Sequence, residues 1–152
     1  MEINIIYSEG LGKNLKKKEI KKSVKEISSL IVKEENINPE ILNFIFCDDK
    51  MIREYNRKYL GHDYETDILT FFDEDDNGIK EGELLISIDT VRSNSEYFKT
   101  EFSIELQRVV IHGMLHLSGY KDNKLSERKA IRKKEDYYLK NLNNLNNAGK
   151  NI

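Results

Sequence analysis

Two histidines stand one helical turn apart in a chain that contains only three. His112 and His116 are four residues apart, and Asp122 follows six residues after His116. Residues i and i+4 of a helix project from the same face, so both imidazoles can reach one metal ion. Gly119 favours the left-handed turn that ends a helix, which would let the chain fold back and bring in Asp122. Three protein ligands with one open position are typical of a catalytic zinc site.

The histidine pair also has a simpler interpretation, as two core residues bonded to backbone carbonyls or water. The segment that carries them is apolar on nearly all sides, which predicts a helix in the core. An unpaired buried polar group costs about 1–3 kcal/mol, so two imidazoles on one buried face favour a shared partner. The apolar residues of this segment are Ile104, Leu106, Val109, Val110, Ile111, Met114, Leu115 and Leu117.

The spacing of ligands and glycine matches the metzincin protease motif, His-Glu-x-x-His-x-x-Gly-x-x-His. In those proteases the glutamate is the general base that activates the water held by the metal. Gly113 occupies the position of that glutamate. The carboxylate that peptide hydrolysis needs is therefore missing, and a protease becomes the less favoured hydrolase.

Length and composition predict one domain, residues 1–142, followed by an asparagine-rich tail, residues 143–152, that we expect to be frayed. The net charge of −2 across 152 residues excludes a generally polybasic protein. A single cysteine, Cys47, allows no intrachain disulfide. The N-terminus lacks the pattern of a secretory signal, and no apolar run is long enough to span a bilayer. We therefore expect a cytoplasmic protein.

Apolar periodicity predicts an alternation of strands and helices. Strands are expected at residues 3–7, 41–47, 67–72 and 83–88, with the last two forming a hairpin. Helices are expected at residues 13–35, 48–59, 90–99, 103–117 and 125–142. The histidines fall in the fourth of these helices, and either Asp48 or Asp49 is expected to cap the second.

Residues 112–120 read His-Gly-Met-Leu-His-Leu-Ser-Gly-Tyr. This resembles the signature His-Gly-x-Leu-His-Leu-x-Gly-Tyr-Asp-His of the YbeY-type endoribonucleases, which are bacterial rRNA maturation factors. Residues 56–71 are similar to the family segment Asn-x-x-Tyr-Arg-x-x-Asp-x-Pro-Thr-Asp-Val-Leu-Ser-Phe. Residues 82–87 are similar to its Gly-Asp-Ile-x-Ile-Ser strand, and Glu135 matches a usual acidic position. The resemblance runs from about residue 41 to residue 139.

The resemblance implies a compact α+β domain in which a small mixed four-stranded sheet packs against helices. It also implies a zincin-like site on a buried helix, with one Zn²⁺ per chain. The implied activity is single-strand-specific, metal-dependent RNA hydrolysis, in 16S rRNA 3′-end maturation and ribosome quality control. Single-stranded rRNA and the small ribosomal subunit are the implied partners.

Two positions depart from the family pattern. Asp122 stands where the family has its third histidine ligand, and Leu60 stands where it has an arginine. Two imidazoles and a carboxylate still suit zinc, but they suit iron(II) or manganese better than three imidazoles would. The added negative charge should make the metal a weaker acid toward its water. Loss of the arginine removes a cation that could stabilise phosphate charge.

The remaining catalytic and binding residues stay open in the sequence. Gly113 cannot act as a base, and the candidate carboxylates are Glu135, Asp67 and Glu83, each of which also has an ordinary structural interpretation. Arg57 and His62, close to the lost arginine, are the candidate RNA contacts.

A lysine-rich segment is the candidate phosphate-binding surface, although a solvated helix face explains it more simply. Its members are Lys13, Lys16, Lys17, Lys18, Lys21, Lys22 and Lys25. If Leu60 marks a loss of chemistry, the alternative function is a ribosome-assembly factor that binds RNA and holds a structural metal.

Overall fold

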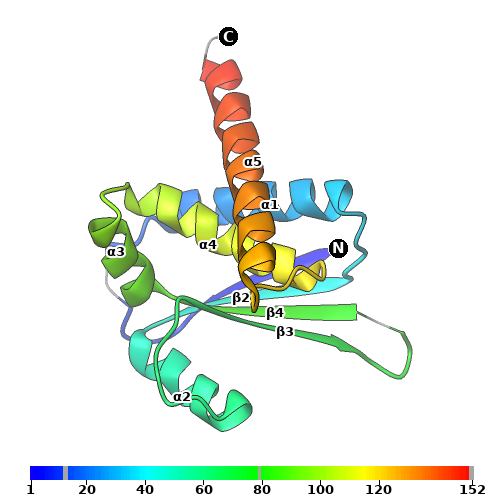
Figure 1. Ribbon diagram of the computed structural model, residues 1–152, viewed down its shortest axis with the longest axis vertical. Coiled ribbons are helices and arrows are strands. Elements are labelled where there is room, and N and C mark those ends of the chain that lie inside the picture. Colours follow the sequence, from blue (N-terminus) through cyan, green and yellow to red (C-terminus); the bar gives the residue numbers. More distant parts are fainter. Residues whose placement is uncertain (12–13, 79, 151–152) are drawn as a thin grey trace.

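A computed structural model describes residues 1–11, 14–78 and 80–150, with residues 144–150 described by their backbone only. Strands and helices follow the expected order along the chain (Figure 1). The elements are β1 (Glu2–Tyr7), α1 (Lys17–Glu34), β2 (Ile41–Cys47), α2 (Asp49–Leu60), β3 (Ile68–Glu74), β4 (Lys80–Ser87), α3 (Ile88–Tyr97), α4 (Phe102–Leu117) and α5 (Leu125–Lys150).

The four strands form one mixed sheet in the order β1-β2-β4-β3. β1, β2 and β4 are parallel, whereas β3 and β4 form the expected antiparallel hairpin. The two parallel pairs require long crossovers, and helices supply them. This arrangement confirms the α+β domain with a small mixed sheet.

The helices cover the two faces of the sheet unequally. α1, α4 and α5 lie on one face and α2 lies on the other (Figure 1). Side chains of β4 alternate between the faces, as strand geometry requires. Leu84 lies beneath α4 near Gly113, whereas Leu85 packs in a small cluster with Ile52 of α2. The larger core therefore lies between the sheet and α4.

α4 is the buried helix predicted to carry the metal site. Val110, Ile111 and Met114 on this helix have no exposed surface. Its close approach to the sheet explains Gly113, because a Cβ there would lie 2.8 Å from Leu84 Cδ2 and closer still to Ile68 Cδ1. Gly113 thus lets α4 settle on β3 and β4.

The ends of the helices follow the expected local signals. The Asp48 side chain accepts a hydrogen bond from the Met51 N–H at 2.8 Å and caps α2. After α4, Gly119 adopts a φ of 102°, in the left-handed region. The Tyr120 N–H then donates to the Leu115 carbonyl at 3.1 Å, which closes the turn as in other glycine-ended helices. This turn sends the chain back along the face of α4.

Two helix boundaries differ most from expectation. α1 begins at Lys17, four residues later than predicted, and the predicted first residue, residue 13, lies outside the described residues. α5 continues to Lys150, past the predicted end at residue 142. Asparagine is a weak helix former but not a helix breaker, and the leucines at positions 142 and 145 preserve helical spacing. Fraying of the tail stays a prediction, and residues 151–152 lie outside the described part. Along that part, every helix is too short or too polar to cross a membrane.

Candidate metal centre

Three predicted ligands converge at the C-terminal end of α4. His112 and His116 project from successive turns of that helix, and Asp122 comes from the loop before α5. The two Nε2 atoms lie 2.9 Å apart. Asp122 Oδ2 lies 3.4 Å from Nε2 of His112 and 3.2 Å from Nε2 of His116. These three side chains form a group able to hold one metal ion.

The spacing of the three atoms fits a small divalent metal. Zinc binds nitrogen and oxygen ligands at about 2.0–2.2 Å in a tetrahedral arrangement, so neighbouring ligand atoms should lie about 3.3 Å apart. The observed separations of 2.9, 3.2 and 3.4 Å bracket that value. These three side chains would hold the metal and leave a fourth position free for water or substrate.

Hydrogen bonds to the other ring nitrogens fix the orientation of both imidazoles. His116 Nδ1 donates to the Tyr120 carbonyl oxygen at 2.9 Å. His112 Nδ1 donates to Glu135 Oε2, also at 2.9 Å. A neutral imidazole has one donor nitrogen, so both Nε2 atoms present lone pairs to each other and to Asp122. A cation between them is the arrangement that satisfies all three.

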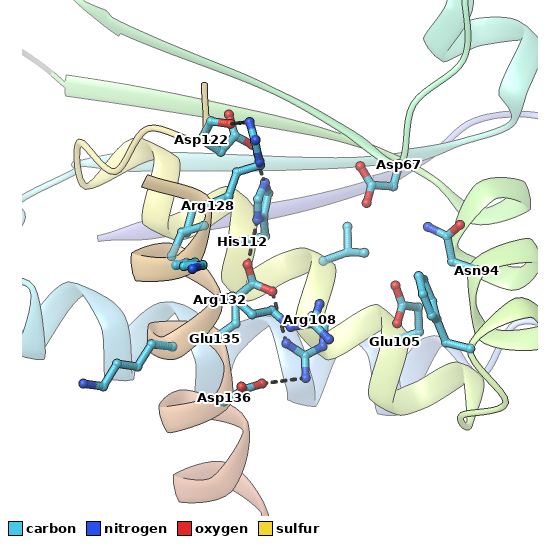
Figure 2. A pocket seen from close by; sticks show the side chains of 15 residues that line it. Asp67, Asn94, Glu105, Arg108, His112, Asp122, Arg128, Arg132, Glu135 and Asp136 are labelled. Carbon is cyan, nitrogen blue, oxygen red and sulfur yellow. Dashed lines mark hydrogen bonds and ion pairs between the residues drawn. The ribbon is translucent and has the colours of Figure 1, made fainter. Parts of the chain in front are cut away.

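Glu135 on α5 is a positioning residue for His112. Its side chain is 6% exposed, and it also accepts a hydrogen bond from Arg108 Nη1 at 3.2 Å. Arg108 in turn donates to Asp136 at 2.9 Å, as Figure 2 shows. A carboxylate behind a ligating histidine is the usual arrangement at metal sites, since it fixes the tautomer and raises the basicity of the ligand. The structure thus places this base candidate behind a ligand.

The charge around His112 favours a cation. Burial by itself would lower the pKa of His112, but the hydrogen bond that its ring donates to Glu135 and the charges of Glu135, Asp67 and Asp122 raise it above its ordinary value. A site that stabilises a proton on this ring also stabilises a metal cation beside it. The two compete for the same nitrogen, so acid should release the metal.

The loop that carries Asp122 is held from α5. Arg128 Nη1 donates to the carbonyl oxygens of Asp122 at 3.4 Å and Asn123 at 2.9 Å. The Tyr120 hydroxyl, at the start of this loop, donates to Glu35 at 2.6 Å. Both contacts limit the movement of the third ligand.

A cavity of about 790 Å³ opens beside His112 and Asp122, between α3, α4 and α5. Figure 2 shows the labelled side chains that line it, with His112 near the centre. The other lining residues are Asp67, Asn94, Phe98, Glu105, Arg108, Val109, Arg128, Lys129, Ile131, Arg132, Lys133, Glu135 and Asp136. A cavity of this size beside the candidate ligands has room for part of a polymeric substrate.

The other residues that were predicted to act as a base or to contact RNA lie in different parts of the structure. Asp67 lines the cavity, whereas Glu83 shares the opposite sheet face with Leu85. Neither Arg57 nor His62 belongs to the cavity lining. Their role as RNA contacts stays a prediction.

The end of α2 is exposed. The His62 ring stacks on Tyr64 with ring centroids 5.3 Å apart, and the Tyr64 hydroxyl lies 2.8 Å from His62 Nδ1. Leu60, at the family arginine position, is 49% exposed and also lies outside the cavity lining.

Apart from Lys13, which lies outside the described residues, the predicted lysine surface lies away from the metal centre. Lys17, Lys18, Lys21 and Lys25 flank a separate groove along β1, the edge strand farthest from β3. The cations of the metal cavity come instead from α4 and α5, and sequence reasoning missed them. A sequence signal for this surface was present. Arg128, Arg132 and the acidic Asp136 are spaced four residues apart, which places all three on one helix face.

Residues 6–143 match the protein family described as Endoribonuclease YbeY. The chain belongs to that family. An Endoribonuclease YbeY from Karelsulcia muelleri is 47% identical over 109 residues, which cover 72% of this chain and 77% of the relative. One from Chlorobium phaeobacteroides (strain DSM 266) is 42% identical over 128 residues, covering 84% and 89%.

The fold has a counterpart among solved structures. The solution structure of TM1509 from Thermotoga maritima superposes with a TM-score of 0.61 at 31% identity, covering 90% of this chain and 86% of that one. The YbeY family assignment predicted from residues 112–120 and their upstream segments is therefore confirmed.

Proposed function

We propose that this chain is a metal-dependent endoribonuclease that cuts single-stranded RNA, with His112, His116 and Asp122 holding one Zn²⁺ ion. The observation that carries the proposal is the convergence of two imidazole lone pairs and a carboxylate oxygen within 3.4 Å of one another. Membership of the Endoribonuclease YbeY family supports the same activity.

The protein groups have separable tasks. A divalent metal, when bound, supplies a Lewis acid for a phosphoryl oxygen and an acidified water as nucleophile. Glu135 and the Tyr120 carbonyl orient the two histidines, and the cavity admits the RNA strand beside them. Asp122 adds negative charge, so the set also suits iron(II) or manganese. Arg57 and His62 are proposed as outer RNA contacts.

The proposed cellular role is maturation of the 16S rRNA 3′ end and ribosome quality control in the cytoplasm, with the small ribosomal subunit as partner. It rests on the family resemblance of residues 41–139. The alternative, a ribosome-assembly factor that binds RNA without cutting it, rests on Leu60 at the family arginine position. A protease is disfavoured, because Gly113 packs against Leu84 and leaves no room for a glutamate side chain.

One preparation can test the activity. Metal content is measured by elemental analysis, and cleavage of an unpaired rRNA fragment is followed with chelated and zinc-loaded protein. We expect one equivalent of zinc and cleavage only in the loaded sample. His116→Ala should lose both, whereas His62→Ala should keep its metal. Retention of metal and cleavage in His116→Ala would refute the site. Bound zinc with RNA binding but no turnover would favour the assembly factor.

A further inference from the structure

The cavity beside the metal centre has two chemically different sides. On one side of His112, α5 contributes Arg128 and Arg132, as Figure 2 shows. On the other side lie Asn94 from α3 and Glu105 from the first turn of α4. A single strand has a charged backbone and uncharged bases, so this asymmetry bears on how it would lie.

Three cations on α5 are available to an external anion. Arg108 is occupied by Glu135 and Asp136. By contrast, Lys129, Arg132 and Lys133 form no salt bridge within 4.0 Å among the residues that the structure describes. Lys129 precedes Arg132 by three residues and Lys133 by four, so each of these two lies one helical turn from Lys129. Unpaired arginine and lysine side chains beside an open cavity suit phosphate groups.

Glu105 is the opposite case, a carboxylate that faces the cavity without a donor. The residue is 7% exposed and lines the cavity, and no hydrogen bond reaches its carboxylate from the described part of the chain. Burial raises the pKa of Glu105, and the charges of Asp67 and Glu135 add to that effect, although the charges of Arg108 and Arg132 oppose it. A carboxylate that faces a cavity without a protein donor can pair with a ligand that brings N–H donors.

An aromatic ring lines the same cavity as this acceptor. Phe98, at the C-terminal end of α3, is 60% exposed and lines the same cavity. Proteins that bind single strands commonly stack bases on exposed aromatic rings and read their edges with nearby polar side chains. Phe98 follows Asn94 by one turn of α3, and with Glu105 these residues give the cavity lining a stacking face, an amide and a carboxylate.

We propose that single-stranded RNA crosses the cavity with its phosphates along Arg132 and Lys133 and one base in a subsite formed by Phe98, Asn94 and Glu105. The proposal rests on the proposed RNA function. It adds the side of the cavity on which the phosphates lie and a site that recognises one base. Guanine fits best, because its N1–H and N2 amino donors lie side by side on the Watson–Crick edge and can reach both oxygens of one carboxylate. Uracil offers a single donor there.

The phosphate side is tested by the salt dependence of binding. Fluorescence anisotropy follows the zinc-loaded full chain with labelled 2′-O-methyl RNA, whose integrity is checked on a gel. Replacing Arg132 and Lys133 together by alanine should lower the log–log salt slope by about 1.4, at about 0.7 per lost phosphate contact. The matched control is the pair Lys33→Ala and Lys140→Ala, two exposed lysines outside the cavity lining, which should leave the slope unchanged. An unchanged slope in the α5 double variant would overturn the proposal.

The base side uses the same assay with oligouridine and oligouridine carrying one guanosine. The wild-type chain should bind the guanosine strand about tenfold more tightly. Glu105→Gln should abolish that preference and keep oligouridine binding, whereas Phe98→Ala should weaken both strands. A preference that survives in Glu105→Gln, or that is missing in the wild type, contradicts the subsite. Cleavage of unmodified RNA is scored separately, so failure of the nuclease activity is distinguished from failure of the binding mode.

Discussion

The Nε2 atoms of His112 and His116 lie 2.9 Å apart while the Nδ1 atom of each ring donates to an oxygen. Two lone pairs held face to face repel each other unless a proton or a metal ion lies between them. The hydrogen bonds from Nδ1 are therefore as much part of the metal centre as the ligands, and they make the behaviour of Glu135 predictable.

Removal of the charge behind His112 should weaken metal binding. Glu135→Gln keeps an acceptor near Nδ1 but loses the negative charge that raises the basicity of the ring. Loss of such a supporting partner typically reduces metal affinity by about 10–100-fold. Competition with a chromophoric chelator measures the change. Asp136→Asn, which alters the exposed partner of Arg108, serves as control and should have a much smaller effect. Equal affinities for wild type and Glu135→Gln would contradict the assigned role.

Asp122 should set the acidity of the site. A carboxylate ligand lowers the effective charge of the metal, so Asp122→His should make the site a stronger Lewis acid and favour zinc over manganese. The rising limb of the pH–rate profile for RNA cleavage is expected to move to lower pH in Asp122→His. Profiles recorded with each metal provide the measurement, and elemental analysis must show full loading of both proteins. If the rising limb of the Asp122→His profile moved to higher pH instead, the charge of the Asp122 carboxylate would not be what sets the acidity of the site.

Gly113 should be required for packing rather than for chemistry. Its Cβ in Gly113→Ala would lie 2.8 Å from Leu84 Cδ2 and closer to Ile68, inside a filled core. Overpacking of this kind costs typically about 1–3 kcal/mol. Urea unfolding should report that loss, with the control Gly61→Asn, at an exposed helix end, costing less. Peptidase activity in Gly113→Glu would show instead that the position was limited by chemistry.

Local signals in the sequence predicted the helix that carries the metal site and its termination. The His112–His116 spacing and the left-handed turn at Gly119 depend on neighbouring residues alone, and the structure agrees with both. Base candidates could not be sorted in this way. Glu135 lies behind His112, and Glu83 faces the other side of the sheet, because of how distant elements pack. Strand order and helix docking decide such contacts, and they leave no short-range pattern.

The residues that line the cavity likewise depend partly on local sequence and partly on the packing of distant elements. Arg128 and Arg132 lie on one face of α5 by spacing, but only the docking of α5 against α4 brings that face to the metal. The lysine-rich start of α1 has a stronger sequence signal, and it lies along β1 instead. Density of charge in the sequence was therefore a weaker guide to the cavity than helical periodicity beside the predicted ligands.

Ionisation of Glu35 should make the free energy of unfolding depend on pH. Burial alone would raise the pKa of Glu35, but hydrogen bonds from Tyr120, Tyr138 and Lys134 outweigh it and hold the pKa below its ordinary value of 4.5. A carboxyl whose folded pKa is depressed contributes stability above its unfolded pKa, and that contribution is lost as pH falls through the folded value. Glu35→Gln should therefore be less stable than wild type at neutral pH by about 1–3 kcal/mol. The difference should shrink below about pH 4.5, where the wild-type advantage is titrated away.

Denaturant unfolding between about pH 3 and pH 7 measures the effect, because this range includes the ordinary pKa of a glutamate carboxyl. Glu54→Gln on exposed α2 is the control, since removal of an unburied carboxylate should leave the pH dependence close to that of the wild type. Because Tyr120 also supplies the carbonyl that orients His116, Glu35→Gln should weaken metal affinity as well. A stability difference that stays constant across this pH range would show that the charge of Glu35 contributes nothing and that only its shape matters.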